Sequence, residues 1–211
     1  MWGVDMGFLI NPRLSASRVK IPIVCAWAER PNPSKVPAGT EMSVLDCGGA
    51  IAVAGVAGWV FRPIELFNSS TPVLISGAAG SADQVAHQFT IPASLMGAKG
   101  VIATELFGAF SVASANSKTL KMKIGSSTLC ALAWSASHKT FSALSRVKNI
   151  TKASQANMDG GIFNFGGSGG NIITSSIDTS VDTTVHFTIA LGNATETCTF
   201  HGIRATVYPA M

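Results

Sequence analysis

Apolar and polar residues alternate along much of the second half of the chain. The clearest case is the stretch KTLKMKIG, in which Leu120 and Met122 alternate with Lys121 and Lys123. A helix would distribute these lysines around its circumference, so the period of two predicts a half-buried strand with Met122 facing a core. The residues Gly125-Ser126-Ser127 that follow predict a turn into a second strand, TLCALAW, and therefore a hairpin.

Similar strand patterns recur in segments that Ser, Asn and Gly turns separate. The further predicted strands are Val85–Ile91, Val101–Phe110, Thr140–Ile150, Gly161–Phe165, Asn171–Ser175, Thr184–Leu191 and Thr197–Tyr208. Together with the hairpin they make about nine short strands, a pattern that predicts an all-β fold, namely an antiparallel sandwich of two sheets.

The first part of the chain has a different texture. Five prolines lie between Pro12 and Pro37, and no sustained periodicity is present, which indicates extended chain with short strands. The apolar run Cys47–Phe61 is shorter than the roughly 20 residues of a bilayer span, so we expect a buried β-turn-β segment and no membrane insertion. We therefore expect an extended N-terminal arm and small β module over residues 1–84, and the sandwich over residues 85–211.

The stretch IDTSVDTTVHFTIAL has two incompatible interpretations. On a helix, Asp178, Asp182 and His186 would share one face at i, i+4 and i+8, as three metal ligands would. The β-branched run Thr183–Val185 is unfavourable for a helix, and apolar residues alternate after it. On a strand, Asp178 would lie about 26 Å from His186 at about 3.3 Å per residue. We therefore expect a strand with an outward His186 and no metal site.

Other catalytic signals are equally weak. The run Gly166–Gly170 matches G-x-S-x-G, but a nucleophile elbow needs a strand before the serine and a helix after it, and the run lies in a glycine-rich loop. The histidines His87, His138, His186 and His201 are scattered, although His186 and His201 would suit adjacent strands. We expect no enzyme activity, no catalytic residues, no metal and no cofactor.

Composition adds a constraint on the surface. Apolar residues make up 47% of the 211 residues and charged residues only 12%, which indicates a surface of small polar residues or contacts with other copies of the chain. With so little charge to keep sheet faces and edges apart, we expect a homotrimer. The four cysteines form no C-x-x-C pair, so we expect free thiols rather than a zinc site.

Basic residues concentrate in the middle of the chain. Seven lie between Leu106 and Met158, where no acidic residue occurs. A basic face of this kind would suit nucleic acid or an anionic glycan, and the alternative is an ordinary solvated sheet face. We expect no nucleic-acid partner. The candidate anionic-partner surface consists of Lys118, Lys121, Lys123, Lys139, Arg146 and Lys148.

Several motifs resemble those of a known class of proteins. VPAGTEMSVLDCG at residues 36–48, followed by GWVFRP at residues 58–63, resembles a module of tailed-phage structural proteins. The stretches IPASLMGAKGVIATELFGAFSVASANSKTLKMKIGSSTL and IDTSVDTTVHFTIALGNATETCTFHGIRATVY resemble the C-terminal β-domain of phage tail-fibre-like and virion surface proteins. Together these segments cover about half of the chain.

The resemblance implies a tailed-bacteriophage virion surface protein whose C-terminal domain is a jelly-roll-like sandwich, commonly trimeric. Such a protein is assembled in the host cytoplasm, docks through its N-terminal arm onto capsid, tail or collar proteins, and carries no catalytic residues. The expected function is a non-enzymatic tail-fibre or receptor-binding component, or a head-fibre component, with a host surface glycan as a further partner. The alternatives are a capsid decoration or collar protein, and a secreted lectin-like carbohydrate-binding module.

Overall fold

The structure is a computed structural model and describes residues 23–56, 58–77, 82–112, 116–134, 139–157 and 174–211. These ranges contain strands, turns and three short 3-10 helices, and no α-helix occurs in them. The all-β fold class predicted from the sequence is therefore confirmed. Within the described ranges there is also no helix with the length and hydropathy of a membrane span.

A small four-stranded sheet, called the N-terminal sheet here, comes first in the chain. In spatial order its strands are β1 (Ile23–Cys25), β2 (Glu41–Val44), β3 (Ala50–Gly55) and β4 (Gly58–Phe61). The short helices beside it are η1 (Trp27–Glu29), η2 (Pro33–Lys35) and η3 (Leu45–Cys47). Strand β1 runs parallel to β2, whereas β3 pairs antiparallel with both β2 and β4. The predicted β-turn-β segment is thus the β3–β4 hairpin.

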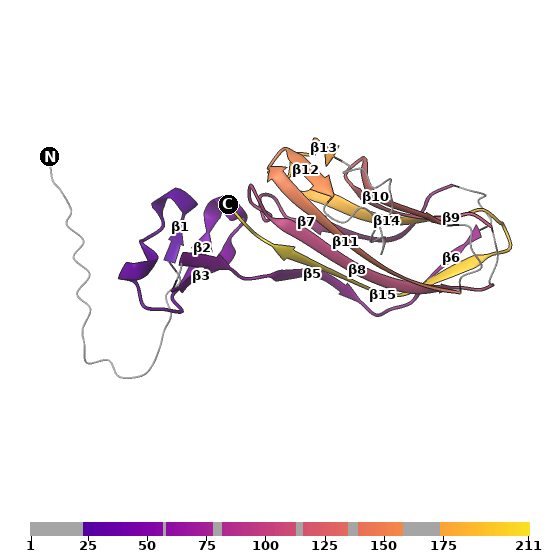
Figure 1. Ribbon diagram of the computed structural model, residues 1–211, viewed down its shortest axis with the longest axis horizontal. Helices are drawn as coiled ribbons and strands as arrows, with labels where there is room; N and C mark the ends of the chain where they lie inside the picture. The colour runs from indigo at the N-terminus through magenta and orange to yellow at the C-terminus, as the bar shows by residue number, and fades with distance from the viewer. Residues whose placement is uncertain (1–22, 57, 78–81, 113–115, 135–138, 158–173) are drawn as a thin grey trace, which may run out of the picture.

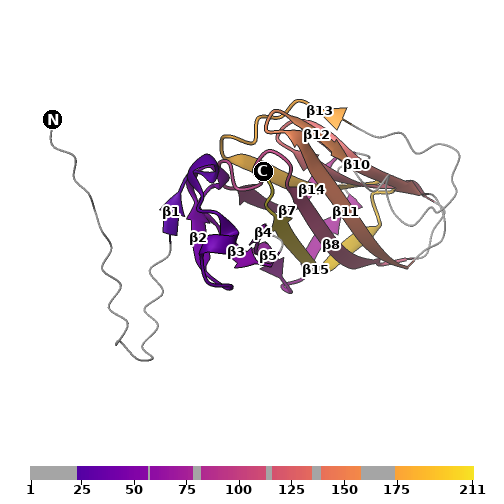
Figure 2. The ribbon, with the colours of Figure 1, turned by 60° about the vertical axis from the view of Figure 1, so that its left-hand side comes forward.

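The rest of the described chain forms two sheets that pack face to face (Figures 1 and 2). The minor sheet contains, in spatial order, β10 (Ser127–Trp134), β9 (Lys118–Ile124), β14 (Thr183–Leu191) and β7 (Gln84–Ile91). The major sheet contains β13 (Thr174–Ser175), β12 (Ser154–Asn157), β11 (Thr140–Thr151), β8 (Val101–Phe110), β15 (Thr197–Tyr208) and β5 (Ile64–Ser69), and β6 (Val73–Ser76) also pairs with β15.

The strand pairings are nested in the way that defines a jelly roll. Strand β6 pairs with β15, β7 with β14, β8 with β11, and β9 with β10, and successive pairs alternate between the two sheets. This order places two Greek keys in two packed sheets. The jelly-roll-like antiparallel sandwich is therefore visible in the pairing itself.

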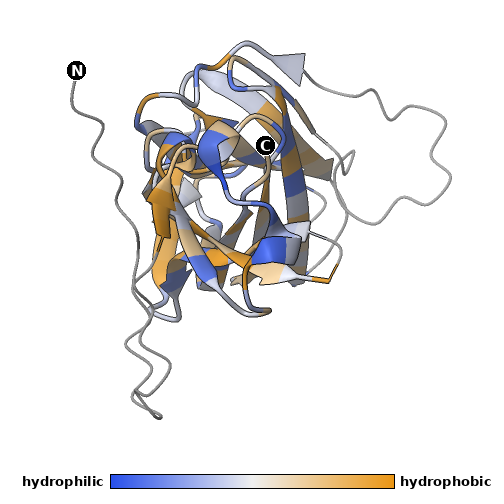
Figure 3. Cartoon of the chain, turned by 90° about the vertical axis from the view of Figure 1, so that its left-hand side faces the viewer, coloured by the Kyte–Doolittle hydropathy of each residue, from blue (hydrophilic) through white to orange (hydrophobic). Residues whose placement is uncertain are grey.

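The period of two in the sequence determines which side chains enter the core. In β9, Leu120 and Met122 are buried while Lys121 and Lys123 point outward, as predicted. Gly125 has φ +56° in the two-residue connection to β10, a conformation that glycine adopts without strain. Seen from the N-terminal sheet, bands of hydrophobic and hydrophilic residues follow one another along the strands (Figure 3).

The segment with two interpretations is resolved in favour of the strand. Thr183–Leu191 is β14, and its inward residues include Val185 and Phe187. Asp178 and Asp182 lie before it and hold turns, because Asp178 Oδ1 accepts from the Ser180 backbone N–H at 2.8 Å and Asp182 Oδ1 from Ala93 at 2.8 Å. A helical face of ligands does not form.

The sandwich draws on strands that the sequence pattern did not single out. Both β5 and β6 precede residue 85 and pair with β15, and β12 forms a hairpin with β11. The domain boundary between residues 84 and 85 remains a prediction. In the structure, β5 and β6, which precede that boundary, belong to the major sheet of the sandwich. The predicted strand Gly161–Phe165 lies outside the described residues, and of Asn171–Ser175 only Thr174–Ser175 is described, as β13.

Part of the expected N-terminal arm packs closely onto the N-terminal sheet. The ring of Trp27 stacks on Phe61 with centroids 5.1 Å apart, and its backbone N–H donates to Asp46 Oδ1 at 2.9 Å. Trp59 Nε1 donates to the Pro31 carbonyl at 2.8 Å. From residue 23 onward the proline-rich segment is therefore folded against the sheet rather than extended, because its tryptophan and the Trp59 indole find partners there.

The sandwich has two different ends, which we call proximal and distal. The proximal end faces the N-terminal sheet and also receives the C-terminal residues, where Ala210 exchanges backbone hydrogen bonds with Met96 and Lys99 (Figure 1). Cys47 Sγ of η3, which connects β2 and β3, donates to the Leu95 carbonyl there at 3.5 Å. At the distal end β6, β8, β10 and β14 end, and β7, β9, β11 and β15 begin (Figure 1). The N-terminal sheet and the distal loops thus lie at opposite ends.

Candidate functional site at the distal loops

The six predicted basic residues do not form one surface. Lys121 and Lys123 project from β9 on the outer face of the minor sheet. Arg146 and Lys148 alternate with the buried Val147 and so project from β11 on the outer face of the major sheet. Because the two sheets turn their inner faces toward one another, these two pairs of cations face opposite directions.

An acidic residue from another element lies between the two minor-sheet lysines. Asp83, just before β7, accepts from Lys121 Nζ at 2.8 and 3.0 Å and from Lys123 Nζ at 2.6 Å. Partial burial by itself would raise the pKa of the Asp83 carboxyl, but the hydrogen bonds and charges of the two lysines outweigh it and hold the pKa below its usual value. The positive charge of this face is therefore partly neutralised.

Lys118 departs from the expected surface altogether. Its side chain is 0% exposed, at the distal end of β9, whereas Lys139 is exposed just before β11. The period-two pattern of β9 contains the signal for this position, because Lys118 has the same parity as Met122 and must face inward with it. The charge of Lys118 suggested a surface position, whereas the alternation along the strand predicts the buried position that the structure shows.

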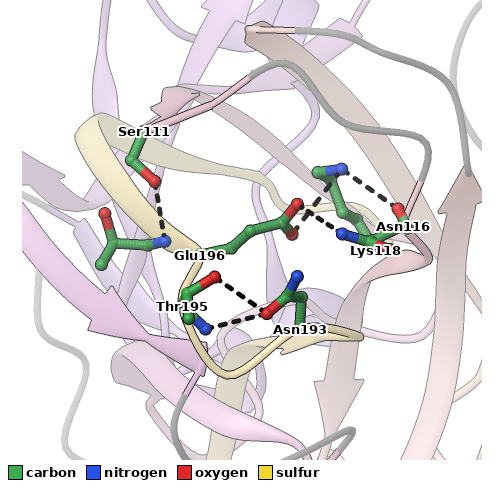
Figure 4. Close-up of polar contacts among 7 residues, drawn as sticks. Ser111, Asn116, Lys118, Asn193, Thr195 and Glu196 are labelled. Carbon is green, nitrogen blue, oxygen red and sulfur yellow. Dashed lines mark hydrogen bonds and ion pairs between the residues drawn. The ribbon is translucent and has the colours of Figure 1, made fainter.

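The buried ammonium group of Lys118 lies in a polar cluster with Glu196 (Figure 4). Lys118 Nζ lies 3.8 Å from Glu196 Oε2 and donates to the Asn116 carbonyl at 3.0 Å. Asn116 Nδ2 donates to Glu196 Oε1 at 3.1 Å, and the Phe110 ring centroid lies 5.2 Å from Lys118 Nζ. A buried charge persists when it is paired and hydrogen-bonded, and this cluster meets both conditions.

The connection that carries Glu196 is itself held in a tight turn. Asn193 Oδ1 accepts from both the backbone N–H and the Oγ1 of Thr195 at 2.9 Å (Figure 4). The Glu196 carbonyl accepts from the Gly77 N–H at 2.8 Å, which links the turn to the end of β6. Ser111 Oγ accepts from the Thr197 N–H at 3.0 Å, which links it to the end of β8. Three distal connections are therefore joined into one polar unit.

The histidines do not come together in a shared site. His186 lies on the outer face of the minor sheet and His201 on the outer face of the major sheet, so the two are not neighbours, and each is an outward residue of a sheet face. His87 is buried in the sandwich, with the rings of Phe67 and Phe200 at 5.9 and 6.0 Å. Burial lowers the pKa of His87. His138 lies outside the described residues.

The described residues show no arrangement suited to holding a metal ion. No group of three or more His, Cys, Asp or Glu side chains in these ranges is placed to hold a metal ion. Between the sheets there is a cavity of about 20 Å³, lined mainly by apolar side chains such as Leu106, Met122 and Phe187. The run Gly166–Gly170 lies outside the described residues.

The four cysteines are thiols rather than disulfides, and their environments differ. Cys47, Cys130 and Cys198 are buried, and Cys25 is half-buried. Burial raises the pKa of Cys198 to about 12. Burial also raises the pKa of Cys47 to about 11, although the positive charge of Lys152 opposes the rise. These two thiols are poor nucleophiles at neutral pH, since the thiolate is the reactive form.

Comparison with known proteins gives distant structural likenesses only. No protein-family model and no curated protein matches the chain. The CBM2 module of the evolved Dit protein of Lactobacillus casei BL23 phage J-1 is 10% identical, with a TM-score of 0.35, over 71% of this chain and 98% of the module. Lectin II from Ulex europaeus is 15% identical, with a TM-score of 0.30, over 74% of this chain and 89% of the lectin.

A viral capsid protein gives a likeness of the same order. The VP2 subviral particle of infectious bursal disease virus is 12% identical, with a TM-score of 0.32, over 76% of this chain and 42% of VP2. Identities and TM-scores this low do not assign the chain to any of these groups. The assignment to a jelly roll rests on the strand pairings described above.

Proposed function

We propose that this chain is a non-enzymatic virion surface protein that docks on the particle through its N-terminal sheet and presents the distal end of the jelly roll for attachment to a host. In this proposal it serves as a tail-fibre or head-fibre component. The observation that carries the proposal is the opposition of two unlike regions, exposed apolar side chains on the N-terminal sheet and a buried polar cluster around Lys118 and Glu196 at the distal end.

The N-terminal sheet carries exposed apolar side chains on its outer face. Val24 is 57% exposed and Val60 is 64% exposed, and the register places Val60 beside Val53 and Val24 beside Ser43 on that face. Leu45, 59% exposed, lies close by in the chain. Exposed apolar groups gathered on one element are typical of surfaces that bind another protein. This supports docking of the N-terminal sheet on a neighbouring virion protein.

The distal end has the opposite character. The Lys118–Glu196 cluster and the hydrogen bonds of Asn193 hold the β14–β15 turn in place before any ligand arrives, so this turn has little conformational entropy left to lose on binding. Attachment proteins use such loops on a rigid β scaffold for recognition. A homotrimer in which three copies present their distal ends side by side would add avidity to weak individual contacts.

Particle incorporation tests the docking half of the proposal. In particles assembled with the Val24→Asp/Val60→Asp variant, we expect the protein to be absent from purified particles, because two carboxylates would have to be buried at the docking surface. The matched control is Leu74→Asp/Val181→Asp, at side chains of the sandwich that are 66% and 56% exposed. Equal incorporation of both variants, at equal melting temperature, would overturn docking through this sheet.

Labelling of intact particles tests the presentation half. Thr195 is exposed in the turn between β14 and β15. A biotin attached to Thr195→Cys should bind streptavidin on the intact particle, whereas a biotin attached to Val60→Cys should bind streptavidin only after the particle is dissociated. A capsid decoration or collar protein would give a high copy number per particle on the head, and a fibre component would give a low one at defined positions. If wild-type protein is missing from purified particles, the virion role is wrong.

A further inference from the structure

We propose that the outer face of the major sheet carries a binding site for a neutral sugar ring, centred on the exposed ring of Phe107. The inference rests on the attachment role proposed above, and it adds to the distal end a second surface and a ligand class for that surface. The site is separate from the distal loop cluster and from the six basic residues predicted from the sequence. Its components come from β8, β15 and β5.

An aromatic ring lies exposed on this face and is held against the backbone. Phe107 in β8 is 55% exposed, although its strand lies between β11 and β15 within the sheet. Opposite it in β15 is Gly202, where a Cβ atom would lie 2.5 Å from Phe107 Cε1. Only glycine leaves room for the ring in this position. One face of the phenyl ring therefore contacts the sheet, while more than half of the side chain remains open to solvent.

A β-bulge places a second ring beside the first. The register of β15 shifts between Phe200 and Gly202, so His201 and Gly202 together stand opposite Phe107. The extra residue, His201, points outward, and its ring stacks with that of Phe107 at a centroid distance of 6.5 Å and an interplanar angle of 23°. Bulges often redirect a side chain next to a functional site. Here the bulge extends the platform of Phe107.

Hydrogen-bonding groups flank the platform two residues further along the strands. Glu105 is exposed, stands next to Arg204 in the register and makes no hydrogen bond or ion pair with the described residues. Arg204 Nε donates to Glu65 Oε2 at 2.9 Å, and Asn68 Nδ2 donates to Glu65 Oε1 at 3.2 Å. Two residues of strand correspond to about 6.6 Å, so these groups lie within reach of the hydroxyls of a ring stacked on Phe107.

This combination of groups selects the class of ligand. The apolar C–H face of a hexose suits the negative π-face of an aromatic ring, and its hydroxyls both donate and accept, which matches carboxylate, guanidinium and amide groups at the rim. At the rim, two carboxylates and one guanidinium leave no excess positive charge for an acidic sugar, and Arg146 of the same face stands opposite Ala103, four residues from Phe107. Exposed charges so close to the ring also disfavour a second protein copy, since the cores of protein interfaces are depleted of charged residues.

Titration of the purified protein with methyl glycosides of glucose, galactose, mannose and N-acetylglucosamine, followed by NMR chemical shifts, tests the site. We expect at least one glycoside to bind with a Kd on the order of millimolar, the range of about −4 kcal/mol, and Phe107→Ala to weaken it at least tenfold. Phe107→Trp should retain binding. Glu105→Gln should weaken it less than Phe107→Ala.

The matched control is Tyr208→Ala. Tyr208 is aromatic, 47% exposed and on the same outer face, but its partner Val101 lies six residues from Phe107 in β8, about 20 Å along the strand. Binding should be unchanged in this variant. The proposal is overturned if no neutral glycoside binds, if both alanine variants lose binding equally, if sialic acid binds in preference, or if Phe107→Ala changes the oligomeric state. Because these titrations use isolated protein, they do not depend on docking to a particle.

Discussion

The two ends of the sandwich bury polar side chains by different chemistry. At the proximal end Asn149 is 0% exposed, and its Nδ2 donates to the Gly97 carbonyl at 2.8 Å and to Thr179 Oγ1 at 2.9 Å. At the distal end Lys118 and Glu196 are equally buried but charged. Neutral amides that bond the backbone need only their hydrogen bonds, whereas buried charges also need each other.

The choice between a neutral amide and an ion pair corresponds to the segments that are joined at each end of the sandwich. Proximal amides join segments of the sandwich, as Gln155 does by accepting from the Ile177 N–H at 3.0 Å and donating to its carbonyl at 2.7 Å. The distal pair joins loops from opposite parts of the chain, and Asn116 and Glu196 are 80 residues apart. A charged pair is directional and intolerant of a missing partner, so it fixes those loops in one arrangement. Breaking each end separately tests this comparison.

The largest effect should follow from removing the cation at the distal end. Lys118→Met leaves the Glu196 carboxylate buried without the ammonium group, and we expect a loss of about 3–5 kcal/mol in the free energy of unfolding, measured by urea denaturation. The double variant Lys118→Met/Glu196→Leu should recover most of that loss, because no buried charge remains. A single variant as stable as wild type would show that the pair does not hold the distal end.

A smaller loss should follow at the proximal end. Asn149→Leu removes two hydrogen bonds and leaves the Gly97 carbonyl buried without the amide donor, at a cost of about 1–3 kcal/mol. The same denaturation experiment measures it. If Asn149→Leu lowers the free energy of unfolding more than Lys118→Met does, the neutral amide at the proximal end contributes more than the ion pair at the distal end, and the proposed ranking is wrong.

Mild acid should affect the middle of the sandwich. Because burial lowers the pKa of His87 below its ordinary 6.5, the unfolded chain binds a proton more readily than the folded one. Stability linked to His87 is therefore complete above pH 6.5 and is lost as the pH falls from 6.5 toward the folded pKa. Melting temperatures between pH 7.5 and 5.5 should fall for wild type and fall less for His87→Phe, which keeps an aromatic ring between Phe67 and Phe200.

The smallest effect should come from the exposed lysines of the minor sheet. Lys121→Ser/Lys123→Ser removes ion pairs to Asp83 whose lysine side chains are 29% and 27% exposed, and we expect a change within about 1 kcal/mol in thermal unfolding. Met122→Asp on the opposite face of the same strand serves as the reference, since it buries a carboxylate and should cost several kcal/mol. Equal losses in the two variants would contradict the assigned faces of β9.

Much of the fold was predictable because side-chain direction along a strand is a local property. The strand Val101–Phe110 was predicted with the bounds of β8, and Thr184–Leu191 differs from β14 by one residue. Strands β5 and β6 were missed because their patterns are short and irregular, and because they pair with β15, which lies far away in the chain. Local pattern says that a segment is a strand, but it does not say which neighbour the strand will have.

The candidate sites depended on such neighbours. The alternation of apolar and polar residues in β9 was enough to predict that Met122 faces inward and Lys121 outward, because successive side chains of a strand point to opposite faces. Only the tertiary structure decided that Asp83 lies between Lys121 and Lys123, that Glu196 accompanies the buried Lys118, and that a bulge places His201 beside Phe107. Those contacts join residues far apart in the chain, and strand order and register, which are set by the packing of the whole sandwich, bring them together.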